Sequence, residues 1–353
     1  MRGSKVLKIS LEDSGSYLGR EKGCLLVKNK KKKTEKRYPL FENEVGEVQI
    51  RSGNFVSSGA LVTCAFWGIN VSVLTHRGNP IAVLRPLDDS SHVLTRLCQY
   101  ETIKTLRAFD IAKEFVLGKL RGQDQVLKKY GLRRNDFSDI MAVKNLDPQE
   151  ERTFRRKLTN IEGKCSKRYF KQIFQLFPEY LRPKGRFTFK AYDGINNTFN
   201  LAYEMLKWKI HIALINAKLE PYLGFVHSVQ FGKPSLVLDF QDLYRYLVDD
   251  IIIEYSKKLT EKDFVFKTEM FASKKGKRQY LNKERTKELT KRFNTFFRSK
   301  VEIPRIKVGN KQEIETLLSE EASLFAKYLR KERKEWKPKN CKFTLIYFLY
   351  FLK

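Results

Sequence analysis

The strongest candidate for a chemical site combines a histidine with nearby carboxylates. The segment "LGFVHSVQFGKPSLVLDFQD", residues 223–242, holds one of only four histidines, His227, followed by Asp239 and Asp242 among apolar neighbours. Apolar residues at helical spacing after Pro234 predict a helix that places both aspartates on one face, three positions apart. Two carboxylates this close repel each other unless a cation lies between them. The pattern therefore indicates a cation site.

A third carboxylate, Glu162, belongs to the segment "LTNIEGKCSKRYF". Leu158, Glu162, Cys165 and Tyr169 recur at the spacing of one helical face, so Glu162 is expected on or beside a buried stripe. A buried carboxylate is costly unless it is paired or bound to a metal. Taken singly, each residue has an ordinary structural explanation. Glu162 can pair with a lysine or arginine, His227 can be a satisfied core histidine, and the aspartates can favour a helix dipole.

Together, imidazole and carboxylates without a thiolate suit Mg²⁺ or Mn²⁺ rather than structural zinc. Enzymes that act on phosphodiesters commonly combine a divalent cation with a basic surface that binds the phosphate backbone. The sequence contains no G-x-x-x-x-G-K-[ST] loop and no Rossmann glycine fingerprint, so ATP hydrolysis and nicotinamide chemistry are not supported. Asp249 and Asp250, further along the same helix, are predicted to be surface or salt-bridged residues.

The charge of the chain favours a polyanionic partner. The 70 lysines and arginines exceed the 40 acidic residues by 30, which favours nucleic acid, with an anionic membrane surface as the rival. The run Lys30–Lys33 is expected to be solvated at a hairpin tip. Plain solubility explains the basic segment 274–278 about as well as strand contact does. The candidate nucleic-acid contacts are Arg152, Arg155, Arg156, Arg245, Lys274, Lys275, Lys277 and Arg278.

Cysteine usage and hydropathy favour a cytoplasmic protein without a membrane span. The five cysteines are scattered and form no C-x-x-C pair, which argues against a disulfide framework and a zinc ribbon. Lys5 and Lys8 interrupt the start, so no signal peptide is expected. The longest apolar run, residues 341–352, is too short to cross a bilayer. We expect this tail to dock on the chain or on a second copy, with a surface anchor as the alternative.

The elements that must position the site change character along the chain. Residues 1–88 alternate and predict a small β-rich domain with one short helix within residues 56–68, and hairpins over 23–41 and 70–84. From His92 onward the period becomes 3.6, which predicts a larger helical domain over 92–340. Helices are expected at 150–177, 195–219, 234–259 and 310–335, and a basic loop near 274 leads into a basic helix. The predicted fold class is α+β, followed by the tail 341–353.

Three segments in this order resemble a known family. "NIEGKCSKRYF", "DGINNTFNLAYEML" and "LGFVHSVQFGKPSLVLDFQDLYR" are similar to the hallmark segments of CRISPR-associated protein one, the adaptation integrase. The early segment "VSSGALVTCAFWGINVSVLTHRGNP" resembles that family's amino-terminal domain. Three motifs in the right order are more specific than any one. Tyr246 stands where the family often has proline, and the tail has no counterpart.

The resemblance implies a homodimer that works with a small ferredoxin-like second adaptation protein. Such an enzyme joins the 3′-hydroxyl ends of short foreign DNA to a CRISPR repeat by transesterification, and it can also cut DNA as an endonuclease. By position, Glu162, His227 and Asp239 resemble the metal-binding triad and Asp242 an additional ligand or support. Tyr203 resembles an aromatic residue near the site and is a further candidate nucleic-acid contact. The alternatives are a transposon-type integrase, a stand-alone structure-selective nuclease, or a non-enzymatic nucleic-acid-binding protein.

Overall fold

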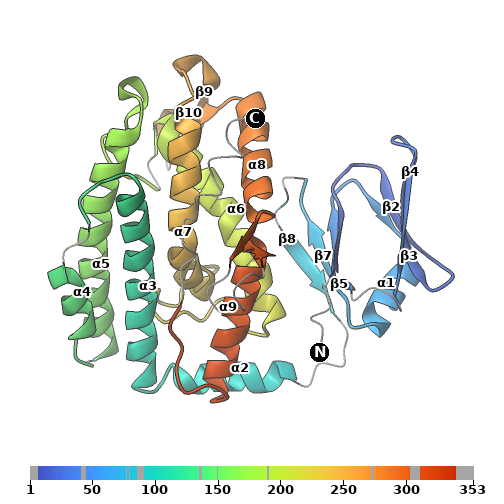
Figure 1. Cartoon of the computed structure of the whole chain (residues 1–353), viewed down its shortest axis with the longest axis horizontal. Coiled ribbons are helices and arrows are strands. Elements are labelled where there is room, and N and C mark those ends of the chain that lie inside the picture. The colour runs from blue at the N-terminus through green and yellow to red at the C-terminus, as the bar shows by residue number, and fades with distance from the viewer. Residues whose placement is uncertain are drawn as a thin grey trace. The chain divides into compact units, whose positions relative to one another are not determined.

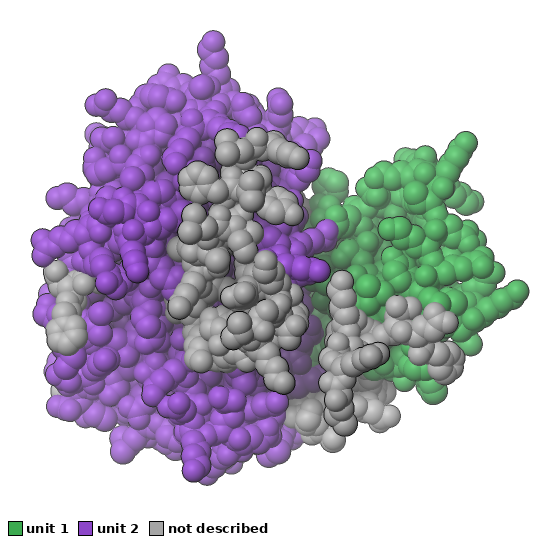
Figure 2. Space-filling model, viewed as in Figure 1, with its two compact units in different colours: residues 1–91 green, residues 92–353 purple. Residues whose placement is uncertain are grey.

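The chain divides into two compact units, residues 1–91 and 92–353 (Figure 2). The computed structural model describes residues 7–40, 45–76, 78, 80–85, 91–134, 137–148, 150–188, 191–271, 274–302 and 311–338. Strands dominate the first unit and helices the second, so the predicted α+β class is confirmed. The tail 341–353 and most of the segment 86–91, where the domain boundary is predicted, lie outside the described residues.

The first unit contains two four-stranded sheets (Figure 1). One has the order β1-β5-β7-β8, with β1, β5 and β7 parallel and β8 antiparallel; the other has the order β4-β3-β2-β6. Their apolar faces and the helix α1 enclose a core around Leu18, Val48 and Val71. The predicted hairpins and short helix are confirmed. The bounds are β1 (Leu7–Leu11), β2 (Ser16–Glu21), β3 (Cys24–Asn29), β4 (Thr34–Pro39), β5 (Val45–Arg51), β6 (Phe55–Val56), α1 (Ser58–Phe66), β7 (Asn70–Leu74) and β8 (Pro80–Leu84).

The second unit is built around helix α7, which packs against α3 and α6 (Figure 1). Nearly every residue of α7 is buried, including Asp239, Asp249 and Asp250. The four predicted long helices are confirmed with slightly shorter bounds. The helices are α2 (Ser91–Thr102), α3 (Arg107–Lys129), α4 (Phe137–Lys144), α5 (Glu151–Ile173), α6 (Gly194–Asn216), α7 (Ser235–Ser256), α8 (Lys283–Phe297) and α9 (Ile314–Leu329).

A glycine brings α3 close to α7. A Cβ atom built on Gly118 would lie 2.5 Å from the Leu243 side chain, so a larger residue there would force that side chain to shift. The neighbouring Lys119 is thereby held against the middle of α7. This close approach matters for the site, because α7 carries the predicted aspartates.

The basic segment after residue 273 differs from the prediction. It is a strand, β10 (Lys274–Leu281), paired antiparallel with β9 (Phe264–Phe271), and the loop prediction is wrong. The lysines hide the alternation, and cross-strand contacts stabilise the pair: the Tyr280 hydroxyl donates to Glu269 over 2.8 Å. The short strands β11 (Lys300–Glu302) and β12 (Lys311–Glu313) form a further pair. Across the described ranges, no helix is long and apolar enough to traverse a bilayer.

Candidate active site

One cavity in the helical unit gathers three of the four predicted catalytic residues. It has a volume of about 550 Å³ and is lined by side chains from α3, α5, α6 and α7 and from the loop before α7. Glu162, His227, Asp242, Tyr203 and Arg245 all line it, whereas Asp239 does not. Segments far apart in the sequence therefore meet at one polar cavity.

His227 is oriented by Asp239. The Asp239 Oδ2 atom accepts hydrogen bonds from the backbone N–H groups of Phe225 (2.6 Å) and Val226 (3.0 Å), and Oδ1 accepts one from the N–H of His227 (3.0 Å). The same Oδ1 lies 2.6 Å from Nδ1 of His227. A carboxylate only accepts hydrogen bonds, so Nδ1 carries the proton and the lone pair of Nε2 is left for another partner.

The local sequence explains why the loop wraps around Asp239. A Cβ atom on Gly224 would lie 2.8 Å from Asp239 Oδ2 and 2.8 Å from the Ser235 side chain, so only glycine lets the loop approach α7 this closely. The Ser235 hydroxyl donates to the carbonyl of Ser228 over 2.8 Å and fixes the return of the chain into α7. Asp239 is 1% exposed. It holds both the backbone and the ring of His227 in place through hydrogen bonds.

Glu162 and Asp242 face each other across a lysine. The Lys119 Nζ atom lies 2.5 Å from Glu162 Oε1 and 3.1 Å from Asp242 Oδ2, and Arg245 Nη1 lies 2.8 Å from Asp242 Oδ1. The Ser166 hydroxyl, one turn after Glu162, donates to Oε1 over 2.6 Å. Burial raises the pKa of Asp242, but Arg245 and Lys119 outweigh burial and lower that pKa to about 2. Asp242 is therefore ionised at neutral pH.

Tyr203 and Asp249 form the back of the cavity. The Tyr203 ring lies between two guanidinium groups, Arg245 at 4.9 Å and Arg186 at 5.4 Å from its centroid. Its hydroxyl donates to Asp249, as does the Tyr169 hydroxyl over 2.7 Å. Burial raises the pKa of Asp249 to about 6, against these two hydrogen bonds.

The prediction for the two later aspartates of α7 is only partly right. Asp249 and Asp250 are both buried, at 1% and 3% exposure, and not on the surface. Asp250 is salt-bridged, with Lys129 Nζ at 2.5 Å. Asp249 instead bonds to tyrosine hydroxyls and lines the cavity.

The donor set can be tested against a divalent cation. Asp242 Oδ1 is buried and, within the part of the chain that the structure describes, accepts no hydrogen bond, although it forms the ion pair with Arg245. Among the same residues, no three His, Cys, Asp or Glu side chains converge closely enough to hold a metal ion as they stand. Lys119 explains the difference, because its ammonium lies between Glu162 and Asp242. The residue types fit Mg²⁺ or Mn²⁺, and the spacing requires the lysine to move.

The predicted basic contacts fall into different places. Arg245 lines the cavity, while Arg152, Arg156 and Lys277 are exposed elsewhere. Arg278 is 14% exposed at its side chain and pairs with Glu269. The side chains of Lys274 and Lys275 lie outside the described set.

Five cationic residues at the cavity were not predicted: Lys119, Lys167, Lys171, Lys184 and Arg186. Lys119 had a usable signature, because Phe115, Lys119, Gly122 and Val126 follow one helical face and the other three are apolar or small. A lysine on such a face is seldom buried unless it is paired. The others are surface lysines and a loop arginine, which no spacing rule distinguishes.

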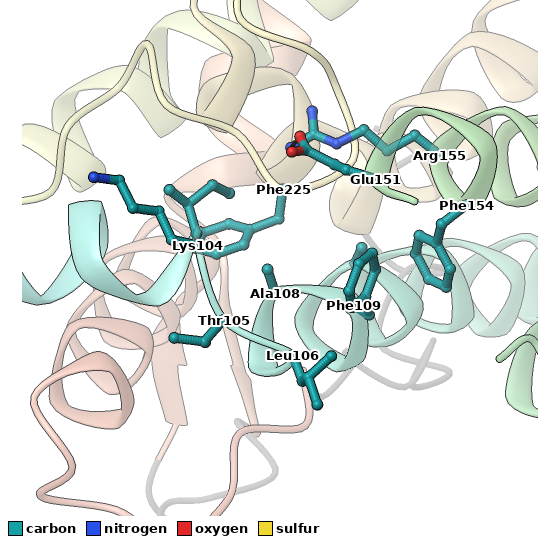
Figure 3. A pocket seen from close by; sticks show the side chains of 11 residues that line it. Lys104, Thr105, Leu106, Ala108, Phe109, Glu151, Phe154, Arg155 and Phe225 are labelled. Carbon is teal, nitrogen blue, oxygen red and sulfur yellow. Dashed lines mark ion pairs between the residues drawn. The ribbon is translucent and has the colours of Figure 1, made fainter. Parts of the chain in front are cut away.

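A second cavity, of about 360 Å³, lies between the start of α3, the start of α5 and the loop residue Phe225 (Figure 3). Figure 3 shows Phe109 and Phe154 side by side, with centroids 4.6 Å apart, and the pair Glu151–Arg155 at its edge. Arg155, predicted to contact DNA, is thus held by Glu151 over 3.0 Å. The walls are mainly apolar, and among the lining residues only Glu151 is a carboxylate.

Comparisons with known proteins agree with the resemblance in the sequence. Residues 9–295 match the family model described as CRISPR associated protein Cas1. A CRISPR-associated endonuclease Cas1 from Pyrobaculum aerophilum is 29% identical over 72% of this chain and 84% of its own length. One from Francisella tularensis subsp. novicida is 28% identical over 72% and 80%.

Solved structures share the fold. A Cas1 protein from Thermotoga maritima aligns with a TM-score of 0.66 and 19% identity, covering 93% of this chain and 98% of that one. A casposase bound to integration product aligns with a TM-score of 0.71 and 18% identity, covering 97% of this chain and 100% of that one.

Proposed function

Because this chain belongs to the Cas1 family of CRISPR-associated proteins, we propose that it is a metal-dependent DNA integrase and endonuclease of CRISPR adaptation. The observation that carries the proposal is the meeting of Glu162, His227 and Asp242 in one polar cavity. The relatives from Pyrobaculum aerophilum and Francisella tularensis subsp. novicida are both named endonucleases, which supports the proposal. A structural neighbour is a casposase bound to an integration product, which favours strand joining as one of the activities.

The geometry favours a metal-ligand set that differs from the sequence-based one. We assign Glu162, Nε2 of His227 and Asp242 as the ligands of Mg²⁺ or Mn²⁺, and Asp239 as the residue that orients His227. The Asp239 carboxylate accepts four hydrogen bonds, three from backbone N–H groups and one from Nδ1 of His227. Both of its oxygens are therefore occupied, and Asp239 does not line the cavity. Asp242 retains a buried oxygen without a hydrogen bond.

The proposed reaction is a transesterification. The 3′-oxygen of an incoming strand bonds to a phosphorus of the repeat, the bond from that phosphorus to its own 3′-oxygen breaks, and the proton lost by the attacking hydroxyl is balanced by one gained by the leaving oxygen. A bound divalent cation supplies stabilisation of the charge at phosphorus and activates the attacking oxygen. With water as the nucleophile, the same site would cut DNA. One phosphodiester replaces another in strand transfer, so ATP is not needed.

The residues around the ligands suit a phosphate backbone. Arg245, Lys167, Lys171 and Lys184 line the cavity, and the three lysines are exposed. The formal charge of +30 would raise the local concentration of DNA and make binding strongly salt-dependent. We also propose a homodimer that works with a small ferredoxin-like second adaptation protein in the cytoplasm. Two structural neighbours were solved in Cas1–Cas2 complexes, which supports a protein partner.

The test is strand transfer of a short duplex into a plasmid that carries the repeat, with Mn²⁺, Mg²⁺ or EDTA, with and without the partner. Asp242→Asn should abolish joining and cutting but retain DNA binding in a filter assay. Asp250→Asn is a matched control, because it removes another buried aspartate of α7 whose partner is Lys129, away from the cavity. Its activity should remain near wild type at a temperature where it stays folded.

Each alternative predicts a different result. Full activity of Asp242→Asn, or full activity in EDTA, would contradict the metal-dependent mechanism. Joining that ignores the repeat would favour a transposon-type integrase, and cutting without joining would favour a stand-alone nuclease. DNA binding with no transformation under any of these conditions would favour a non-enzymatic binding protein.

A further inference from the structure

A buried lysine lies at the centre of the candidate metal site. Lys119 is 8% exposed, and its Nζ lies 2.5 Å from Glu162 and 3.1 Å from Asp242. It reaches from α3 to carboxylates on α5 and α7, so one ammonium joins three helices. Gly118 makes this possible by letting α3 approach α7 at Leu243.

The ammonium lies where two facing carboxylates require positive charge. Without it, Glu162 and Asp242 would repel each other in a half-buried cavity, with side-chain exposures of 19% and 11%. Arg245 forms its ion pair with Asp242, whereas the Lys119 ammonium bridges both carboxylates. A divalent cation bound by both carboxylates would need the space between them, where the Lys119 ammonium lies. An ammonium and a metal ion in that space exclude each other by charge as well as by volume.

We propose that Lys119 is a built-in competitor of the metal, which holds Glu162 and Asp242 together until a divalent cation displaces its ammonium. This inference rests on the proposed metal-dependent function. The lysine stem has four flexible carbons, so the ammonium can withdraw into the 550 Å³ cavity while the helices stay in place. Lys119 is then a positioning residue that sets how tightly the site binds metal, and it stabilises the fold when metal is absent.

The test measures Mn²⁺ binding by isothermal titration calorimetry and thermal unfolding in EDTA and in Mn²⁺. Lys119→Met keeps the apolar stem and removes the charge. We expect it to bind Mn²⁺ at least tenfold more tightly than wild type, about 1.4 kcal/mol. Its midpoint of unfolding should fall in EDTA and rise with Mn²⁺ by more than that of wild type. Lys119→Gln is the second variant, should the methionine variant fail to fold.

Lys129→Met is the matched control. Lys129 also reaches from α3 to a buried aspartate of α7, Asp250, at 2.5 Å, but outside the cavity. Its removal should lower the midpoint of unfolding and leave Mn²⁺ affinity unchanged.

The outcomes separate the inference from the function on which it rests. If wild type binds Mn²⁺ and the folded Lys119 variants bind it equally or more weakly, the competitor role is overturned while the metal site stands. Rescue of Lys129→Met by Mn²⁺ to the same extent as Lys119→Met would also overturn it. If neither wild type nor the Lys119 variants bind Mn²⁺, both the metal-dependent function and the inference fail.

Discussion

Replacing Asp239 by asparagine tests most sharply how this site is held together. The wild-type carboxylate accepts four hydrogen bonds, two at each oxygen: Oδ2 from Phe225 and Val226, and Oδ1 from the N–H and Nδ1 of His227. An asparagine side chain has one accepting oxygen and one donating nitrogen. In either orientation of the amide, the NH₂ group of the asparagine faces two groups of the loop that donate a hydrogen bond in wild type. The more favourable orientation directs the oxygen to Phe225 and Val226 and the NH₂ group to His227.

This orientation changes the tautomer of His227. Facing an NH₂ group, Nδ1 must accept, so the ring proton moves to Nε2, which then has no lone pair for a metal. Changes to groups that orient a metal-bound histidine typically weaken metal binding 10–100-fold. The hydrogen bond from the His227 N–H is lost and the bond at Nδ1 becomes a neutral one, so folding stability should fall by at least the roughly 1.5–3 kcal/mol of one charge-assisted hydrogen bond.

The assay pairs Mn²⁺ calorimetry with urea unfolding for wild type, Asp239→Asn and Asp242→Asn. We expect Asp239→Asn to lose both affinity and stability, because its role is to hold the loop. A folded Asp239→Asn variant with wild-type affinity would refute the orienting role. Loss of affinity with an unchanged free energy of unfolding would instead restore Asp239 as a direct ligand. Wild-type affinity in Asp242→Asn would refute the revised ligand set.

Two further predictions concern the surroundings of the site. Gly224→Ala places a methyl group 2.8 Å from Asp239, so it should weaken Mn²⁺ binding and cost about 1–3 kcal/mol of stability in thermal unfolding. Gly163→Ala, where a Cβ meets nothing within 4 Å on a helix, should stabilise by roughly 0.5–1 kcal/mol, and equal losses for both would contradict this reading. Burial raises the pKa of Asp249 from 3.8 to about 6, so it is protonated in the fold at pH 4 and charged above pH 6. Its contribution to stability is therefore full at low pH and falls by about 2.4 kcal/mol as pH rises from 4 to 7. The stability difference between wild type and Asp249→Asn in urea titrations should change by that amount, and a difference independent of pH would contradict the assignment.

The sequence predicted the larger elements because their patterns are strong. The apolar spacing of α5, α6 and α7 and the hairpin β3–β4 follow directly from periodicity. The strand β10 did not, since "KKGKRQYL" carries its charge on both faces and pairs with β9 through a register that only the fold supplies. Local composition favours a loop there, and cross-strand pairing outweighs it.

The candidate ligands could be found from the sequence, but their roles could not. Periodicity places Asp239 and Asp242 on one face of α7, and nothing in that spacing tells them apart. The distinction comes from Gly224, which lets three backbone N–H groups reach Asp239 and leaves Asp242 facing the cavity. Lys119 escaped prediction for a related reason: its partners lie on two other helices, 43 and 123 positions away in sequence by the difference of residue numbers.

Helix α7 shows why a metal would bind at one aspartate and not at its neighbours. Asp239 is neutralised by backbone amides and Asp249 by tyrosine hydroxyls, and both partner sets are fixed by the fold. Asp250 has a lysine partner, but it does not line the cavity of the proposed metal site. Asp242 combines a cavity position with a lysine whose stem can move. A cation that displaces the Lys119 ammonium would break two ion pairs, whereas at Asp239 it would have to break hydrogen bonds from the backbone. In the proposed mechanism, the exchangeable partner and not the carboxylate alone therefore selects the metal site.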